Sequence, residues 1–186
     1  MGLDMYLSKK TYVKNWEHNG PENQHKITVK KGNKIRKDIK PERISYITEE
    51  VAYWRKFNAL HGWFVNECAD GVDECQDIYV PMDKMEQLLS TLKEVKSVLD
   101  KSKKTVKVLQ DWNGKDYEVS TYDCEDEIKD LLPPTQGFFF GGYEVDDWYK
   151  QDVENTINII EELIEEANGD KEYGLFGGEF YYSASW

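Results

Sequence analysis

The stretch from residue 53 to residue 64 concentrates side chains that could hold a ligand. On a helix, Trp54, Asn58 and His61 would share one face because they are spaced i, i+4 and i+7, with Arg55 beside them. Arginine, asparagine and histidine donate hydrogen bonds, and aromatic rings offer stacking surfaces. The group therefore predicts a site for an anionic or planar ligand. The alternative is that Asn58 and His61 satisfy buried polar groups of the core, which is the commoner role of an isolated helical histidine.

A glycine-flanked aromatic segment, residues 135–142, could cover such a ligand. Its glycines permit close approach of the backbone, and Gln136 would contribute a polar contact. The segment lacks the lysine and the strand-loop-helix setting of a phosphate-binding loop. Its alternative interpretation is a buried edge strand that packs on the core.

Other familiar chemistry has no clear pattern here. The aspartates of residues 70–77 do not have the spacing of a calcium loop. Cys68, Cys75 and Cys124 match neither a zinc site nor a disulfide framework, and a pair between Cys68 and His61 would lack a third group. We therefore expect no cofactor, no metal site and no catalytic residue. Enzymatic activity stays open, and a non-enzymatic role is favoured.

Charge is distributed unevenly along the 186 residues, whose net charge is −12. Residues 1–43 hold 11 Lys/Arg and 5 Asp/Glu, whereas residues 44–186 hold 13 and 31. The acidic majority suits a basic protein partner and argues against nucleic acid. Residues 26–43 hold eight Lys/Arg and two acids, so a hairpin there could follow a phosphate backbone. The alternative is a solvated hairpin face.

The hydrophobic pattern predicts which elements must position these groups. Strands are expected at both ends of the chain and around residue 113, and three amphipathic helices are expected between them. The expected elements are a strand at 2–7, a hairpin over 27–39 with a three-residue loop that pairs Val29 with Ile35, a helix at 48–66, a strand at 78–80, a helix capped by Asp83, strands at 105–112 and 115–122 joined at Asn113-Gly114, a helix at 146–167 stopped by Gly169, and a strand at 179–186.

Together these elements predict one α+β domain over residues 1–186. It would be compact, with a mainly antiparallel sheet, and the three longer helices would pack on strands drawn from both ends of the chain. No stretch approaches the roughly 20 apolar residues that span a bilayer, and no signal peptide is recognisable. We therefore expect a cytoplasmic protein with no membrane contact.

Several segments resemble a group of small proteins of bacteriophages, prophages and some bacterial genomes. The segments that carry the resemblance are Met1–Leu7, Tyr53–Phe64, Asp70–Asp73, Leu131–Pro133 with Thr135–Gly141, and Tyr181–Trp186. The resemblance implies a phage-derived setting in a bacterial cytoplasm. It assigns no functional residue.

Two classes of function follow, and a third stays open. The first is a non-enzymatic accessory protein that binds a host macromolecule through its acidic surface, for example an inhibitor of a bacterial defence system. The second is a small-molecule binder or enzyme with an anionic or nucleotide-like ligand held by Trp54, Arg55, Asn58, His61 and Gln136. The third is nucleic-acid binding through the basic hairpin of residues 26–43.

Overall fold

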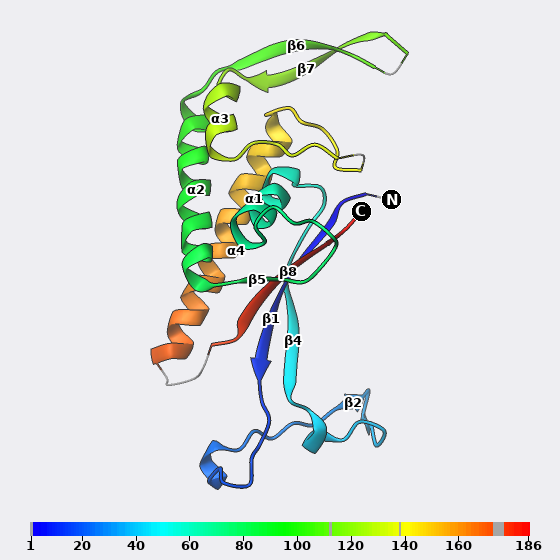
Figure 1. Cartoon of the computed structure of the whole chain (residues 1–186), viewed down its shortest axis with the longest axis vertical. Coiled ribbons are helices and arrows are strands. Elements are labelled where there is room, and N and C mark those ends of the chain that lie inside the picture. The colour runs from blue at the N-terminus through cyan, green and yellow to red at the C-terminus, as the bar shows by residue number, and fades with distance from the viewer. Residues whose placement is uncertain (1, 112, 138, 173–176) are drawn as a thin grey trace.

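A four-stranded antiparallel sheet lies at the centre of the fold. The computed structural model describes residues 2–111, 113–137, 139–172 and 177–186. The strand order is β4-β1-β8-β5. The strands are β1 (Asp4–Tyr12), β4 (Tyr46–Trp54), β5 (Ile78–Val80) and β8 (Glu179–Ser185). The first and last strands of the chain are therefore paired, as predicted (Figure 1).

The sheet buries one face and leaves the other partly open. Side chains alternate along a strand, so Leu3, Met5 and Leu7 all point to the same side and are fully buried. In the neighbouring strands Met5 is level with Trp54 and Ala184, which are also buried. The opposite face carries half-exposed tyrosine pairs. The alternation predicted for the first strand is confirmed.

Among the described residues, three helices lie on the buried side of the sheet, and a short fourth helix packs against the second of them (Figure 1). They are α1 (Asn58–Cys68), α2 (Met82–Lys101), α3 (Glu125–Leu131) and α4 (Asp147–Glu172). The two longest, α2 and α4, pack against each other, and the apolar stripe of α2 is buried, namely Met85, Leu88, Leu92, Val95 and Leu99. The predicted α+β class is confirmed. The three longer helices are α1, α2 and α4, whereas α3 is short.

The helix predicted at 48–66 is wrong in its first half. Residues 46–54 form β4, and the helix begins only at Asn58. The stretch is rich in β-branched and aromatic residues, which favour a strand, and it pairs with β1 from Met5–Trp54 to Tyr12–Tyr46. This pairing buries Ala52 and Trp54 and gives β1 a partner along its whole length. The helical spacing of Val51, Trp54 and Phe57 also fits that strand and the turn after it.

The predicted ends of the two long helices are also corrected. Pro81 precedes α2 at the N-cap position, and Asp83 lies within the first turn without capping it. Proline has a fixed φ and no N–H, so it suits a helix start. Gly169 does not stop α4, which continues to Glu172. Asp170, one residue later, pairs with Lys9 across 3.1 Å, and this contact with β1 helps to hold the last turns helical.

Both predicted hairpins exist with a different register. In the first, β2 (Lys30–Lys31) and β3 (Lys34–Ile35) pair Lys30 with Ile35 around a two-residue loop, and Val29 accepts a hydrogen bond from Arg36. The predicted three-residue loop assumed that one side of the hairpin is buried. Ile35 is 64% exposed, so no buried face selects that register.

The second hairpin consists of β6 (Lys104–Gln110) and β7 (Asp116–Tyr122). Val108 lies opposite Glu118, and Gln110 lies opposite Asp116, one residue away from the predicted register. The loop is longer than two residues because Asp111 forms a local turn. Its carboxylate accepts the N–H groups of Asn113 and Lys115, and such Asx turns compete with the tighter turn.

Residues 13–45 leave the sheet as a separate projection, which we call the basic arm. It connects β1 to β4 and includes β2 and β3 (Figure 1). Among the described residues, no helix is both long enough and apolar enough to cross a membrane. The arm lies at one end of the molecule, and the helices lie toward the other end (Figure 1).

Candidate functional site

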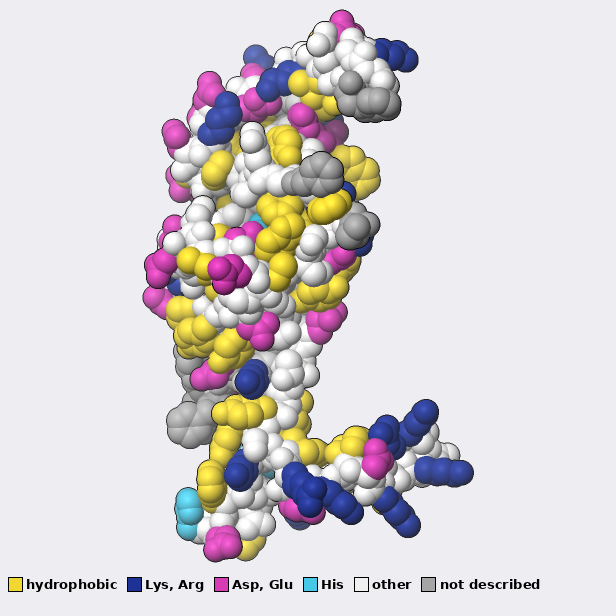
Figure 2. Space-filling view, turned by 45° about the vertical axis from the view of Figure 1, so that its right-hand side comes forward, with side chains coloured by type: hydrophobic (Ala, Val, Ile, Leu, Met, Phe, Trp, Pro, Cys, Tyr) yellow, Lys and Arg dark blue, Asp and Glu magenta, His cyan; other side chains and the backbone are white. Residues whose placement is uncertain are grey.

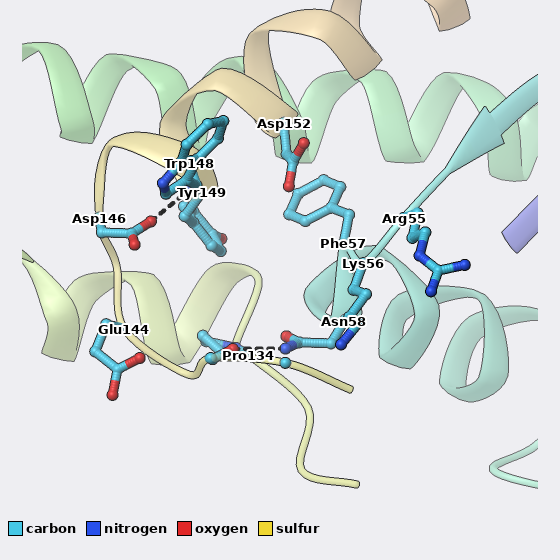
Figure 3. A pocket seen from close by; sticks show the side chains of 12 residues that line it. Arg55, Lys56, Phe57, Asn58, Pro134, Glu144, Asp146, Trp148, Tyr149 and Asp152 are labelled. Carbon is cyan, nitrogen blue, oxygen red and sulfur yellow. Dashed lines mark hydrogen bonds between the residues drawn. The ribbon is translucent and has the colours of Figure 1, made fainter. Parts of the chain in front are cut away.

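A pocket of about 330 Å³ lies where the end of β4, the start of α1 and the start of α4 meet. It is bordered by side chains of both charges and by aromatic rings, which are Arg55, Lys56, Phe57, Asn58, Glu144, Asp146, Trp148, Tyr149 and Asp152. Figure 3 shows Trp148, Asp146 and Glu144 on one side of this space and Phe57 and Asn58 on the other. The pocket therefore separates its basic side chains from most of its acidic ones.

Asn58 holds the segment of residues 135–142 in place, and the end of this segment forms one wall of the pocket. Its amide nitrogen donates to the carbonyl oxygens of Phe140 at 3.0 Å and of Gly142 at 2.7 Å. Its amide oxygen accepts the N–H of Thr135 at 3.1 Å. Asn58 is buried at the first turn of α1, so these bonds hold both ends of the segment against the helix.

The same segment can approach α1 because Gly62 has no side chain. A Cβ atom at Gly62 would lie 1.9 Å from the hydroxyl oxygen of Thr135. Helix interiors disfavour glycine by about 1 kcal/mol, so its presence in α1 has a packing reason. Gly62 and Asn58, four residues apart on one helix, thus place the pocket wall.

Two cations border the pocket at the end of β4. The Arg55 guanidinium donates through Nη1 to both carboxylate oxygens of Asp4, at 2.7 and 2.9 Å, and its side chain stays half exposed. Asp4 also accepts the Tyr53 hydroxyl, and these hydrogen bonds, that of Tyr53 first, lower the pKa of Asp4. Lys56 forms no ion pair with any described residue, so its charge is available to a ligand.

The acidic side of the pocket belongs to the start of α4 and the residues before it. Asp146 accepts the N–H of Tyr149 at 2.9 Å and so caps the helix. Asp152 lies one to two turns further on, half buried. Burial, and then the charge of Asp146, raise the pKa of Asp152 to about 6. Asp152 therefore changes its charge near neutral pH.

Trp148 is the most exposed large apolar side chain of the described residues, at 75% of its surface. Its neighbour Tyr149 is buried and donates its hydroxyl to the Leu132 carbonyl oxygen at 2.7 Å. The first turn of α4 is thus anchored by Tyr149, and Trp148 stands free beside the pocket (Figure 3). An exposed indole next to charged groups is a surface on which a planar ligand can stack.

A second pocket of about 410 Å³ adjoins the first and shares Arg55 and Asp152 with it. Asn155 and Asn158 of α4 and Tyr53 of β4 border it. The two hollows thus lie next to each other between β4 and α4. A ligand longer than the first pocket could extend past Asp152 into the second.

The five residues predicted to hold a ligand separate into two groups. Arg55 and Asn58 border the pocket, although Asn58 serves mainly to hold its wall. Trp54 is buried and its Nε1 donates to the Thr156 hydroxyl at 3.0 Å, and Trp54 also borders the second pocket. Gln136 is exposed and lies outside both hollows. The shared helical face expected for Trp54, Asn58 and His61 does not exist because Trp54 belongs to β4.

His61 belongs to the core rather than to the pocket. Its Nδ1 lies 2.7 Å from the Tyr182 hydroxyl, and its Nε2 lies 3.0 Å from the Asp73 carboxylate. A neutral ring satisfies both contacts if Nε2 donates to Asp73 and Nδ1 accepts from Tyr182. Phe140 and Trp186 pack against the ring. His61 thereby joins α1 to the loop after it and to the last strand.

Segments that lie far apart in the sequence meet around these residues. Asp73, Tyr182 and Trp186 surround His61, and the 135–142 segment is bonded to Asn58. Lys56, Trp148 and Asp152 were not found from the sequence. The sequence signal available for Trp148 was a tryptophan directly after acidic residues at the start of a predicted helix.

Chemistry that depends on a metal or a thiol gains little from this geometry. Among the described residues, no cluster of three His, Cys, Asp or Glu side chains could hold a metal ion. Burial raises the pKa of the Cys68 thiol to about 11, and both ring nitrogens of His61 have other partners.

Comparisons with protein-family models, with curated proteins and with solved structures return no match for this chain.

Proposed function

We propose that the protein binds a small planar ligand with an anionic group, of the nucleotide type, in the pocket between β4 and α4. The observation that carries the proposal is the placement of Arg55 and Lys56 on one side of a 330 Å³ hollow and of the exposed Trp148 on the other. This size lies within the range of small-molecule sites. No catalytic step is part of the proposal.

Each border of the pocket has a complementary role in this proposal. The ring of Trp148 stacks on the planar part of the ligand, which costs little entropy because the ring has few torsions. Arg55 and Lys56 bind the anionic group through charge-assisted hydrogen bonds. Asp152 accepts hydrogen bonds from amino groups of the ligand while it is ionised. The wall fixed by Asn58 keeps these groups in place before binding.

Isothermal titration with a panel of nucleoside mono- and triphosphates tests the proposal. Trp148→Ala and Lys56→Gln should each weaken binding about tenfold or more, since a stacked ring or a charge-assisted bond contributes about 1–3 kcal/mol. Tyr117→Ala and Lys129→Gln, which remove an exposed aromatic ring and a lysine elsewhere, should leave the affinity unchanged. Equal losses in both sets, or no heat with any nucleotide, would exclude the pocket.

The acidic surface favours a second candidate function, which is binding of a basic host macromolecule. Lysines of α2 and α4 pair with acids along the contact between these helices, for example Lys93 with Glu161 and Lys96 with Glu154. Three exposed carboxylates further along α4 form no ion pair with any described residue, namely Glu162, Glu165 and Glu166. Such a surface could occupy the positive groove of a nucleic-acid-binding protein.

Charge reversal tests this second candidate. The triple variant with Glu162, Glu165 and Glu166 each changed to Lys should lose a defined host protein from pulldowns of bacterial lysate. If the protein that the wild type binds and the triple variant loses is a bacterial defence protein, this would support the hypothesis of a phage-derived inhibitor. The matched control reverses Glu42, Glu49 and Glu118, which lie on other exposed parts of the chain. A partner retained by both variants would contradict binding through α4.

A further inference from the structure

The basic arm combines two features that no other part of the described chain brings together. It carries nine Lys/Arg and four Asp/Glu, a net charge of +5 in a protein whose total is −12. At its base stand three exposed aromatic side chains, Tyr12, Trp16 and Tyr46, with exposed fractions of 43%, 48% and 47%. Figure 2 shows lysine and arginine side chains gathered on the projecting hairpin.

The cations of the arm are free of internal partners. Arg36 pairs with Asp38, but seven others form no ion pair with any described residue, namely Lys26, Lys30, Lys31, Lys34, Lys37, Lys40 and Arg43. Several lysines elsewhere behave differently, since three of α2 and two of β6 bridge to acids of neighbouring elements, namely Lys84, Lys93, Lys96, Lys104 and Lys107. The arm therefore presents positive charge that the protein itself does not neutralise.

The aromatic side chains at the base are held as a group. Trp16 donates its Nε1 to the Tyr12 hydroxyl at 2.8 Å, and the rings of Tyr12 and Tyr46 meet edge to face with centroids 5.1 Å apart. Lys14 lies over the Trp16 ring at 4.4 Å, and Lys10 lies over the Tyr46 ring at 4.7 Å. Two of the three exposed rings, Trp16 and Tyr46, thus have an ammonium group beside them.

Rings that alternate with cations match a chain of bases that alternate with phosphates. We propose that the basic arm binds single-stranded nucleic acid, with phosphates along the hairpin lysines and bases stacked on Tyr12, Trp16 and Tyr46. A duplex hides its base faces, so the rings would have nothing to stack on. An acidic protein segment would use the lysines and leave the rings unused.

The acidic remainder of the protein does not prevent this binding. Charges more than about 8 Å apart are largely screened at physiological salt, and the arm extends away from the helices, which carry half of the carboxylates (Figure 1). The whole-chain charge, which argued against nucleic acid, therefore averages over two regions that act separately. The arm is independent of the pocket between β4 and α4, so either proposal can fail alone.

Fluorescence anisotropy with a labelled 20-nucleotide oligo-dT is the direct test. If the arm neutralises about four phosphates, the affinity should fall about 50-fold between 50 and 200 mM NaCl. The variant with Lys30, Lys31, Lys34 and Lys37 changed to Gln should bind more weakly and lose most of this salt dependence. Its control changes four lysines elsewhere to Gln, namely Lys93, Lys101, Lys115 and Lys129. The control should bind as the wild type does.

The aromatic contribution has its own readout. Trp16→Ala should weaken oligo-dT binding at least fivefold and leave the salt dependence unchanged, because a ring contributes no charge. Tyr117→Ala on β7 is the matched control, since it removes an exposed ring outside the arm and outside the pocket, and it should have no effect. Every changed side chain is exposed, so we expect each variant to fold. Circular dichroism checks this expectation. Absence of binding at 50 mM NaCl, equal affinity for polyglutamate, or a preference for duplex would each overturn the proposal.

Discussion

The region around α1 and the basic arm use the same residue types in opposite ways. In the first, Asn58 and His61 are buried and form hydrogen bonds with residues 77 to 121 positions away, and His61 also bonds to Asp73, 12 positions away. In the arm, the Asn15 side chain bonds only to the backbone N–H and carbonyl of His25, ten positions away, and both side chains stay exposed. Histidine and asparagine organise the fold where water is excluded and only shape a loop where it is not. The comparison can be broken or sharpened by paired substitutions.

The largest difference is expected between His61→Ala and His25→Ala. Loss of His61 leaves the Tyr182 hydroxyl without its partner in the core and creates a cavity, so unfolding should become easier by about 3 kcal/mol. His25→Ala should change the free energy of unfolding by less than about 0.5 kcal/mol because the side chain is exposed. Urea unfolding measures both. Similar small values would show that His61 is not an organising residue.

Asn58→Ala should have the next largest effect. It removes three hydrogen bonds and leaves two carbonyl groups and one N–H without their partner, at a cost of about 2–3 kcal/mol. Binding in the pocket should be lost as well, since the wall is released. The control in the arm is Asn23→Ala, because Asn23 is exposed and its side chain forms no hydrogen bond with a described residue. Urea unfolding and isothermal titration report the two effects.

Two helical glycines should respond with opposite signs. Gly62→Ala forces a methyl group against Thr135 and should destabilise the protein by about 1–3 kcal/mol. Gly169→Ala in α4 meets no atom within 4 Å, and alanine favours a helix, so stability should rise by up to about 1 kcal/mol. Thermal unfolding measures both changes. If Gly62→Ala is also stabilising, the approach of the 135–142 segment is looser than described.

The smallest effect concerns the pH dependence at Asp152. Its folded pKa of about 6 exceeds the ordinary value of 3.8, so the folded state binds more protons than the unfolded state between these values. Stability should therefore fall as pH rises from 4 to 6. Solvent screening limits this loss to about 1 kcal/mol. Asp152→Asn should remove the decline, which urea unfolding at several pH values would detect.

Asp126→Asn is the control for this pH series because Asp126 is exposed and pairs only with Lys129 three residues away among the described residues. Its curve should follow that of the wild type between pH 4 and 6. A decline that persists in Asp152→Asn would mean that another group titrates in this range.

The fold was predictable wherever burial followed a simple period. The stripe of α2 and the alternation of Leu3, Met5 and Leu7 each have one apolar face, and the sequence alone identified both. The prediction for residues 46–54 was wrong because their apolar positions fit both a helical period and a strand period. Only the pairing with β1 decides between the two. The hairpin registers failed because neither hairpin buries a face that would fix the register.

The candidate site was half predictable for a related reason. Arg55 and Asn58 were selected by residue type, and both border the pocket. Trp148 and Asp152 come from a helix about 90 residues later, and nothing local indicates that this helix packs beside the end of β4. Gly62 was the local sign that another segment approaches α1 closely. A site formed by distant elements can be inferred from such signs only when the approaching segment is known.

The position of β8 inside the sheet has a consequence for synthesis on the ribosome. β1 and β4 can pair early, but β1 keeps an open edge until residues 179–185 have been made, more than 120 positions after β4 ends. During translation that edge presents unpaired backbone N–H and carbonyl groups, which can recruit other nascent chains. Slow elongation over the last third of the message would lengthen this exposure and lower the yield of native protein.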